Sequence, residues 1–185
     1  AIAHRTRVTE HFYFYLFNNY AFPKRILAET VEVSLGTWAF GSPSIYGTVD
    51  SDAAHRAIRG ALDAGINFFD TAPLYGTSEA DGTAEEVLGK ALGTDREKVC
   101  IATKFGRYHS RGHTNELFDA ETLTWSVEQS LRRLGTDHID VLFFHSPTHP
   151  DNIKDDVWTA FDALKSSGKV RFAGQSCESH FSAAL

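Results

Sequence analysis

Five short apolar runs, separated by longer amphipathic or polar stretches, divide the chain from residue 31 onward. Their first residues lie about 30 to 40 positions apart. An apolar run of this length, closed by turn-forming residues, is typical of a β-strand that is covered on both faces. The five predicted strands are 31–38 (VEVSLGTW), 66–70 (INFFD), 99–104 (VCIATK), 139–145 (IDVLFFH) and 170–174 (VRFAG).

Amphipathic helical patterns occupy the intervals between these strands. In the clearest of them Asp119 is expected to cap a helix, because apolar residues then recur every three or four positions until Gly135. Thr83 and Glu86 have the spacing of a capping box at the start of another helix, which we expect to stop at Gly93. Further helices are predicted near 52–64 and between Ile153 and Gly168.

Strands that alternate with helices predict βαβ units and therefore a parallel sheet. A doubly wound nucleotide-binding sheet is disfavoured, because the segment GTWAFGS after the first strand lacks both GxGxxG and a phosphate-loop lysine. A (β/α)8 barrel of about 250 residues has units of about 31 residues, close to the spacing seen here. We therefore predict an α/β fold in which residues 31–185 form about five units of a (β/α)8 TIM barrel, after an irregular N-terminal segment at 1–30.

Composition excludes several classes of function. The chain has 185 residues and a net charge of −6, which offers no basic stripe for nucleic acid. Its most apolar segment, 11–22, is too short to cross a membrane and contains two asparagines. Cys100 and Cys177 lie far apart without a CxxC pattern, which favours buried thiols in a reducing, cytoplasmic protein. The paired histidines lie in proline-containing or polar loops, so no metal site is expected.

Polar side chains stand where three neighbouring strands end. Asp70 closes the second strand with Tyr75 five residues later, Lys104 closes the third strand, and His145 closes the fourth. In a barrel these ends lie on one face, where active sites collect. Asp70 and Lys104 are expected to pair, because each buried charge would be costly alone. A structural ion pair, a loop aromatic and a core histidine are the simpler interpretations of each residue alone, but their shared location favours a functional site.

The chemistry of these four residues is that of a general acid. A free phenol has a pKa of about 10, and an ammonium beside it favours the phenolate, so we expect Lys104 to lower the pKa of Tyr75. Asp70 would orient Lys104, and a nitrogen of His145 could hydrogen-bond a substrate oxygen. Such a set can protonate an oxygen that gains negative charge, as a carbonyl does when hydride attacks its carbon.

These motifs resemble the aldo-keto reductases from about residue 33 to 185. The matching segments are LGTWAFG, AGINFFDTAPLYG, AEEVLGKAL, IATKFG, SLRRLGTDHIDVLFFHSP and VRFAGQS. The resemblance implies a (β/α)8 barrel, a nicotinamide cofactor that is usually NADPH rather than NADH, and reduction of a small aldehyde or ketone. It places the catalytic Asp, Tyr, Lys and His of the family at Asp70, Tyr75, Lys104 and His145.

Cofactor and substrate contacts are expected around the same strand ends. The predicted cofactor contacts are Gly36, Thr37, Trp38, Asp70, Ser176 and Cys177. Cys177 departs from the family, which usually has asparagine there, and a thiol is a weaker hydrogen-bonding group. The residues predicted to line an apolar mouth for the substrate are Trp38, Phe40, Tyr108 and His145.

Two alternatives to an active enzyme stay open at this point. The same fold serves as a cofactor-binding regulatory subunit of potassium channels, and an intact set of four residues does not exclude that role. The segments in which the family carries its ring-stacking and basic cofactor-binding groups are absent, so the chain could also be an inactive truncated reductase. Five strands do not close an eight-stranded barrel, and we therefore expect self-association through an open edge.

Overall fold

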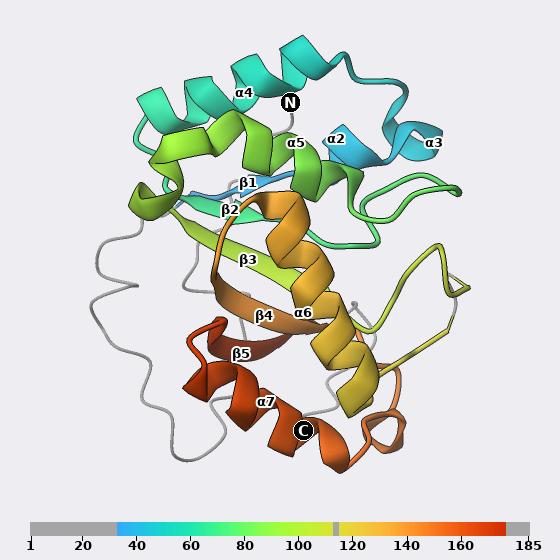
Figure 1. The fold of residues 1–185 in the computed structure, drawn as a ribbon. Coiled ribbons are helices and arrows are strands. Elements are labelled where there is room, and N and C mark those ends of the chain that lie inside the picture. The colour runs from blue at the N-terminus through green and yellow to red at the C-terminus, as the bar shows by residue number, and fades with distance from the viewer. Residues whose placement is uncertain (1–32, 113–114, 177–185) are drawn as a thin grey trace.

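The computed structural model describes residues 33–112 and 115–176 (Figure 1). Five parallel strands form one sheet in the order of the sequence, β1-β2-β3-β4-β5. The strands are β1 Leu35–Gly36, β2 Phe68–Asp70, β3 Cys100–Phe105, β4 Ile139–His145 and β5 Val170–Ser176. The predicted α/β class is confirmed, and the last four strands lie within two residues of their predicted bounds. The first strand, predicted at 31–38, is limited to Leu35–Gly36 among the described residues because α2 begins at Trp38, and the expected irregular segment at 1–30 lies outside them.

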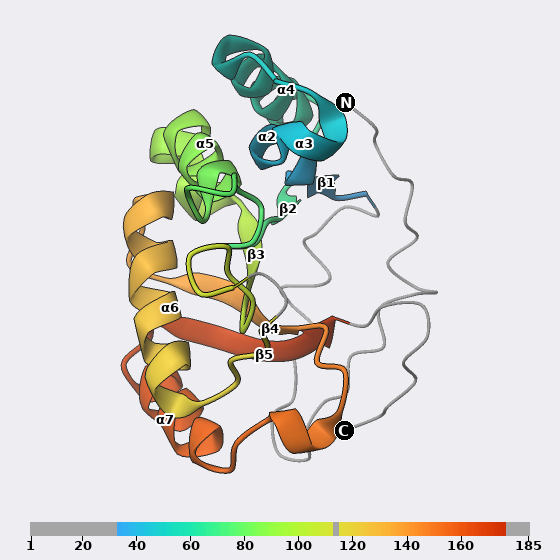
Figure 2. The ribbon, with the colours of Figure 1, turned by 90° about the vertical axis from the view of Figure 1, so that its right-hand side faces the viewer.

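Helices lie along one face of the sheet (Figure 2). The longer ones are α4 Ser51–Asp63, α5 Thr83–Leu92, α6 Ala120–Leu134 and α7 Asp156–Ser166. Two single-turn helices, α2 Trp38–Gly41 and α3 Pro43–Tyr46, follow β1, and the 3-10 helices are η1 Gly93–Lys98 and η2 Pro150–Asn152. A strand order that never reverses, with its helices on one side, is that of successive units of a (β/α)8 barrel and differs from a doubly wound sheet.

Most predicted helix ends are correct, including Gly135 and Gly93 as the stops of α6 and α5, and one is wrong. Asp119 caps α6 as expected, accepting a hydrogen bond from the backbone N–H of Thr122 at 2.8 Å. The capping box at Thr83 is wrong, because Thr83 is already the first residue of α5 and Gly82 precedes it with a φ of 71°. A Cβ atom at Gly82 would also lie 2.1 Å from Nε of the flexible Arg133 side chain, but it is the positive φ that favours glycine here.

The hydrophobic core has three parts. Two clusters join the helices to the outer face of the sheet, one around α6 and α7 and the other around α4 and α5. The third cluster contains strand residues only and covers the inner face: Cys100, Ala102, Val141 and Phe143, with Phe68 and Phe172 packed against it. Burial of Cys100 confirms one of the two expected buried thiols, and Cys177 lies outside the described residues.

The inner face also receives the polar residues that end the strands. Residues two apart on a strand share a face, so each of these polar residues follows the apolar residues of the third cluster. They are Asp70 on β2, Lys104 on β3, His145 on β4 and Ser176 on β5. The strand register therefore collects four chemically active side chains at the carboxyl edge of one face.

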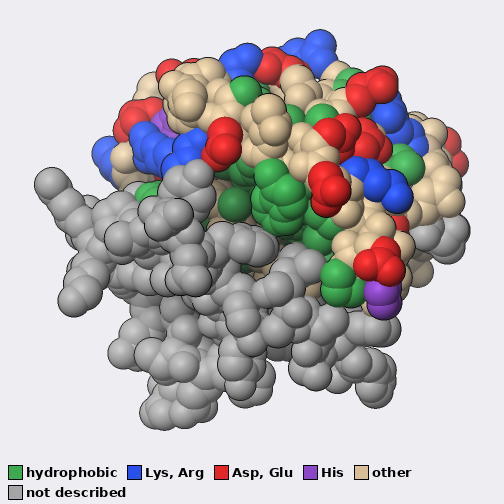
Figure 3. Space-filling model, turned by 90° about the horizontal axis from the view of Figure 1, so that it is seen from below, with side chains coloured by type: hydrophobic (Ala, Val, Ile, Leu, Met, Phe, Trp, Pro, Cys, Tyr) green, Lys and Arg blue, Asp and Glu red, His purple; other side chains and the backbone are tan. Residues whose placement is uncertain are grey.

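The surface of the described residues carries mixed charges. Figure 3 shows acidic and basic side chains interspersed on one face, with hydrophobic side chains between them. This face therefore presents no basic stripe, as expected from the net charge of −6. None of the helices within 33–112 and 115–176 has the length and apolar character needed to cross a membrane.

Candidate active site

Lys104 is the centre of the polar group at the carboxyl edge. Its Nζ lies 2.8 and 2.9 Å from the two carboxylate oxygens of Asp70, 2.9 Å from the carbonyl oxygen of Thr71 and 3.1 Å from the hydroxyl of Tyr75. The Lys104 side chain is 6% exposed, whereas that of Asp70 is 26% exposed. The predicted ion pair is therefore present, and it holds the ammonium directly beside the phenol.

Tyr75 is positioned by its own loop and by α2. Its N–H donates to the carbonyl of Ala72 at 3.0 Å, and its carbonyl accepts from the N–H of Ala84, the second residue of α5, at 2.9 Å. Gly41 at the end of α2 packs against this backbone so closely that a Cβ would lie 2.1 Å from the carbonyl oxygen of Tyr75. The indole of Trp38 stacks on the phenol ring with centroids 5.7 Å apart. The phenol therefore has a defined orientation.

Burial decides the protonation of Tyr75. Removal from water raises the pKa of the phenol, Lys104 lowers it, and the result lies above the ordinary value of 10.0. Lys104 acts in the expected direction, but the expectation of a lowered pKa is wrong because desolvation of the phenolate outweighs the ammonium. Tyr75 is consequently a protonated donor at neutral pH rather than a partly ionised one.

Lys104 remains charged in spite of its burial. Desolvation alone would lower the pKa of this ammonium, but the charge of Asp70 and the contacts with Tyr75 raise it above the ordinary 10.5. Asp70 is thus needed to keep a buried cation at this position. An ammonium in this position would stabilise negative charge on the phenol oxygen.

His145 faces Tyr75 across the edge and is neutral. The two rings meet edge to face, with centroids 6.1 Å apart. Burial, followed by the charges of Lys104 and Arg107, lowers the pKa of His145 well below 6.5. Its Nδ1 atom is buried and has no hydrogen-bond partner within the part of the chain that the structure describes. A neutral imidazole can donate a hydrogen bond from one ring nitrogen and accept one at the other.

The predicted cofactor residues have different surroundings. Thr37 is fully buried, and both its N–H and its hydroxyl donate to the carbonyl oxygen of Asp70, at 2.9 and 3.0 Å. Thr37 therefore holds the backbone of Asp70. Gly36 is exposed, with no heavy atom within 4 Å of the place a Cβ would take. The hydroxyl of Ser176 accepts from the N–H of Ser146 at 3.1 Å, and Cys177 lies outside the described residues.

One of the four residues expected at the substrate mouth belongs to the core instead. Tyr108 is 1% exposed, its hydroxyl accepts from the N–H of Gly106 at 2.8 Å, and its ring packs on Trp125. Phe40 packs against the cluster around α4 and α5. Tyr108 was expected at the mouth because it follows a strand end, but its ring is buried; Phe40 is only part-buried, and its place at the mouth stays a prediction. Trp38 is 43% exposed beside Tyr75, and its contact with a substrate stays a prediction.

Sequence reasoning missed two residues near this edge. Tyr46 at the end of α3 is 44% exposed and meets Trp38 edge to face at 5.5 Å, which extends the aromatic surface beside Tyr75. Arg107 lies three residues after Lys104 and hydrogen-bonds the backbone carbonyl of His145 at 3.0 Å. Neither belongs to a strand pattern, and the order of residues carries no signal for contacts between separate loops.

Comparisons with known proteins agree with this geometry. The model of the Aldo/keto reductase family matches residues 32–183. The chain is 40% identical over 137 residues to an L-galactose dehydrogenase of Arabidopsis thaliana and 35% identical over 150 residues to the aldo-keto reductase YhdN of Bacillus subtilis. Among solved structures, a proposed aldo-keto reductase from Pseudomonas aeruginosa shares 35% identity with a TM-score of 0.67, over 78% of this chain and 54% of that one.

The matches cover most of this chain but only part of the relatives. They span 71% of the chain for the Arabidopsis protein and 80% for YhdN, but only 40% and 44% of those proteins themselves. The chain therefore spans less than half the length of these two curated relatives.

Proposed function

Because the chain belongs to the aldo/keto reductase family, we propose that it reduces an aldehyde or ketone to an alcohol with NADPH as the cofactor. The observation that carries the proposal is the position of the Lys104 ammonium, which contacts both the Asp70 carboxylate and the Tyr75 hydroxyl. The oxidoreductases among its relatives support the reaction class.

In the proposed reaction Tyr75 gives its proton to the carbonyl oxygen of the substrate. The raised pKa of Tyr75 keeps that proton in place until negative charge develops on the oxygen. Lys104 stabilises the resulting phenolate, and Asp70 keeps Lys104 charged and oriented. His145, which is neutral, donates a hydrogen bond that orients the carbonyl oxygen toward the phenol.

The described residues fit the nicotinamide end of the cofactor. The carboxyl edge combines the part-exposed carboxylate of Asp70, the exposed indole of Trp38 and the half-buried imidazole of His145. When bound, the cofactor supplies the hydride. The preference for NADPH over NADH rests on the family resemblance, and binding titrations with both nucleotides test it directly.

Sugar-like carbonyl compounds are our first choice of substrate. Two relatives at 36 to 40% identity are named L-galactose dehydrogenase and 6-dehydroglucose reductase, and both names specify a sugar. The mixed surroundings of Tyr75, with an exposed indole on one side and the polar Asp70 on the other, are compatible with a hydroxylated substrate. We propose a cytoplasmic location for the protein, as its composition favours.

The test is NADPH oxidation by the intact protein with a panel of hexose-derived, aliphatic and aromatic carbonyl compounds. Wild-type protein should turn over at least one class, and Tyr75→Phe should lose about 10²- to 10⁴-fold in kcat, the usual contribution of a general acid. Cofactor affinity should stay within about twofold, because the ring and its stacking on Trp38 remain. A Tyr75→Phe variant that keeps more than a tenth of the activity would refute the assigned role.

A second candidate function is a cofactor-binding regulatory subunit. A Schizosaccharomyces pombe protein proposed to be a voltage-gated potassium channel subunit beta is 36% identical over 150 residues. In that case the protein should bind the nucleotide, co-purify with a membrane channel and turn over no member of the carbonyl panel.

A further inference from the structure

The residue after His145 has an unusual backbone conformation. Ser146 has a φ of 49°, and among the described residues it is the single non-glycine residue with positive φ. Side chains disfavour this left-handed region, and a residue stays in it only where its surroundings hold it there. The turn that ends β4 is therefore held in place by neighbouring groups, and it carries the imidazole of His145.

Strand β5 holds one side of this turn. The N–H of Ser146 donates to the hydroxyl of Ser176 at 3.1 Å and also to the carbonyl of Phe144 at 3.0 Å. The hydroxyls of Ser146 and Ser176 are a further 3.1 Å apart. These contacts engage the N–H of the turn but leave its two carbonyl groups to other partners.

Arg107 binds both of those carbonyl groups. Its Nε donates to the carbonyl oxygen of His145 at 3.0 Å, and its Nη2 donates to the carbonyl oxygen of Ser146 at 2.9 Å. A guanidinium presents its N–H groups in a rigid plane, so two contacts to successive carbonyls define the turn better than one flexible ammonium could. Arg107 reaches the turn from the loop after β3.

Glu116 in turn orients Arg107. Its Oε1 accepts from Nη2 of Arg107 at 2.7 Å, and the two side chains are 11% and 16% exposed. The same carboxylate accepts from the N–H of Thr148 at 3.1 Å and from the amide of Asn152 at 2.6 Å. The Arg107–Glu116 pair therefore connects the loop after β3 with the loop after β4, which begins directly after His145.

We propose that Arg107 is a positioning residue for the carbonyl-binding imidazole, acting through the two backbone carbonyls of the His145–Ser146 turn. The role rests on the function proposed above, in which His145 orients the substrate oxygen. Glu116 supports it by fixing the plane of the guanidinium. Loss of the guanidinium releases the left-handed turn and lets the imidazole move away from Tyr75.

The charges around His145 are consistent with this role. The groups that face the imidazole are Lys104 from β3, the phenol of Tyr75 from the loop after β2, and Arg107 from the loop after β3. Burial is the largest cause of the lowered pKa of His145, and the two cations add to it. Removal of Arg107 should therefore raise the pKa of His145, while removal of a cation distant from the imidazole, such as Arg171, should not.

The experiment compares Arg107→Met, Arg107→Lys and the control Arg171→Met in the intact protein. Arg171 donates to Asp140 at 2.7 Å at the opposite end of the sheet, so its loss removes an arginine–carboxylate pair without touching the turn. Three quantities are measured: the pKa of His145 by NMR, amide hydrogen exchange of Ser146, and kcat and KM for carbonyl reduction. The first two need neither cofactor nor substrate.

Arg107→Met should raise the pKa of His145, accelerate exchange of the Ser146 amide at least tenfold and lower kcat by about 10- to 100-fold, as expected for a small misplacement of a reacting group. Arg107→Lys retains a cation but not the planar fork, so it should leave kcat low. Full recovery of kcat in Arg107→Lys would overturn the proposal, as would values for Arg107→Met equal to those of Arg171→Met.

Two further outcomes separate this proposal from the proposed function. A protein that reduces no carbonyl compound, but whose Arg107→Met variant shows the pKa and exchange changes, contradicts the function and supports the positioning of His145.

If Arg107→Met does not fold, Glu116→Gln replaces it, because this variant keeps the shape of the side chain and removes the charge that orients Arg107. It should shift both NMR quantities in the same direction by a smaller amount, and no shift would refute the proposal.

Discussion

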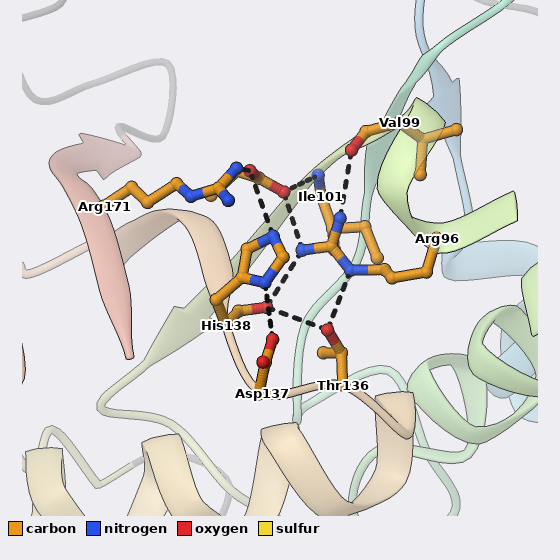
Figure 4. A network of polar contacts seen from close by, with 8 residues as sticks. Arg96, Val99, Ile101, Thr136, Asp137, His138 and Arg171 are labelled. Atoms are coloured by element: carbon orange, nitrogen blue, oxygen red, sulfur yellow. Dashed lines mark hydrogen bonds and ion pairs between the residues drawn. The ribbon is translucent and has the colours of Figure 1, made fainter. Parts of the chain in front are cut away.

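The two ends of strand β4 carry polar networks of opposite character. At the amino end, Asp140 lies in a network in which arginine, carboxylate and backbone groups satisfy one another (Figure 4). At the carboxyl end, His145 keeps a buried nitrogen without a partner among the described residues, and a left-handed residue follows it. Both ends belong to one strand of seven residues, so the difference arises from the groups that surround each end.

The amino-end network is built around Arg96. Its guanidinium donates to Oδ2 of Asp140 at 2.8 Å, to the carbonyl of His138 at 2.9 Å, to the carbonyl of Val99 at 3.0 Å and to the hydroxyl of Thr136 at 3.1 Å. Asp140 also accepts from the N–H of Ile101 at 2.9 Å. Figure 4 shows these groups converging from β3, β4 and the segments before them. A network in which the buried charges bond one another in this way stabilises the sheet.

The polar residues at the carboxyl end are less completely hydrogen-bonded than those around Asp140. Lys104 is satisfied, but the Asp70 carboxylate is part exposed and the imidazole of His145 is incompletely bonded. In barrel folds the carboxyl ends of the strands carry catalysis and the amino ends carry stability. The comparison therefore predicts that substitutions at the carboxyl end of β4 change activity and that substitutions at its amino end change the free energy of unfolding.

Lys104→Met should give the largest loss of activity at the carboxyl end after Tyr75→Phe. Removing the ammonium leaves the Tyr75 phenolate unstabilised, so kcat should fall by at least about 100-fold. The part-exposed Asp70 can be hydrated, so the free energy of unfolding should change little by comparison. Steady-state kinetics and urea unfolding measure the two quantities, and a variant that unfolds readily but turns over normally would reverse the comparison.

Arg96→Met should show the opposite behaviour at the amino end. It leaves the Asp140 carboxylate, whose side chain is 3% exposed, with less compensation. Breaking a buried pair of this kind costs about 3 to 5 kcal/mol of stability, although Arg171 remains beside Asp140 and favours the lower figure. Once corrected for the folded fraction, kcat should equal that of the wild type. A tenfold drop in corrected kcat would show that the two networks are coupled.

Asp70→Asn should have an intermediate effect. The amide still accepts a hydrogen bond from Lys104 but no longer raises the pKa of its ammonium through charge. We expect a loss of about tenfold in kcat, smaller than that of Lys104→Met, because the cation remains in a less favourable state. The rank order of the two variants at one pH is the measurement, and an Asp70→Asn protein as active and stable as the wild type would remove the argument for the ion pair.

The smallest effect concerns pH. Unfolded His145 binds a proton as the pH falls through about 6.5, whereas the folded imidazole, whose pKa lies well below that value, does not. The unfolded state then binds more protons, so this residue makes stability fall as the pH is lowered from 7 toward 5. The slope contributed is at most about 1.4 kcal/mol per pH unit. Urea unfolding of wild type and His145→Gln across this range should show the shallower slope in the variant.

Sequence pattern by itself determined the strands, most helix ends and the identity of four residues at the candidate site. The apolar run 139–145 corresponds to β4 residue for residue, and Asp119 caps α6 as expected. These features depend on neighbours within a few positions along the chain, and the order of residues encodes them directly.

Tertiary structure alone decided the protonation of Tyr75, the burial of Tyr108 and the contact between Arg107 and the His145–Ser146 turn. Each depends on groups brought together from separate segments: Arg107 and His145, for example, are 38 positions apart. The balance between desolvation and the Lys104 charge reversed the expected direction of the Tyr75 pKa, because the extent of burial depends on packing around the whole side chain.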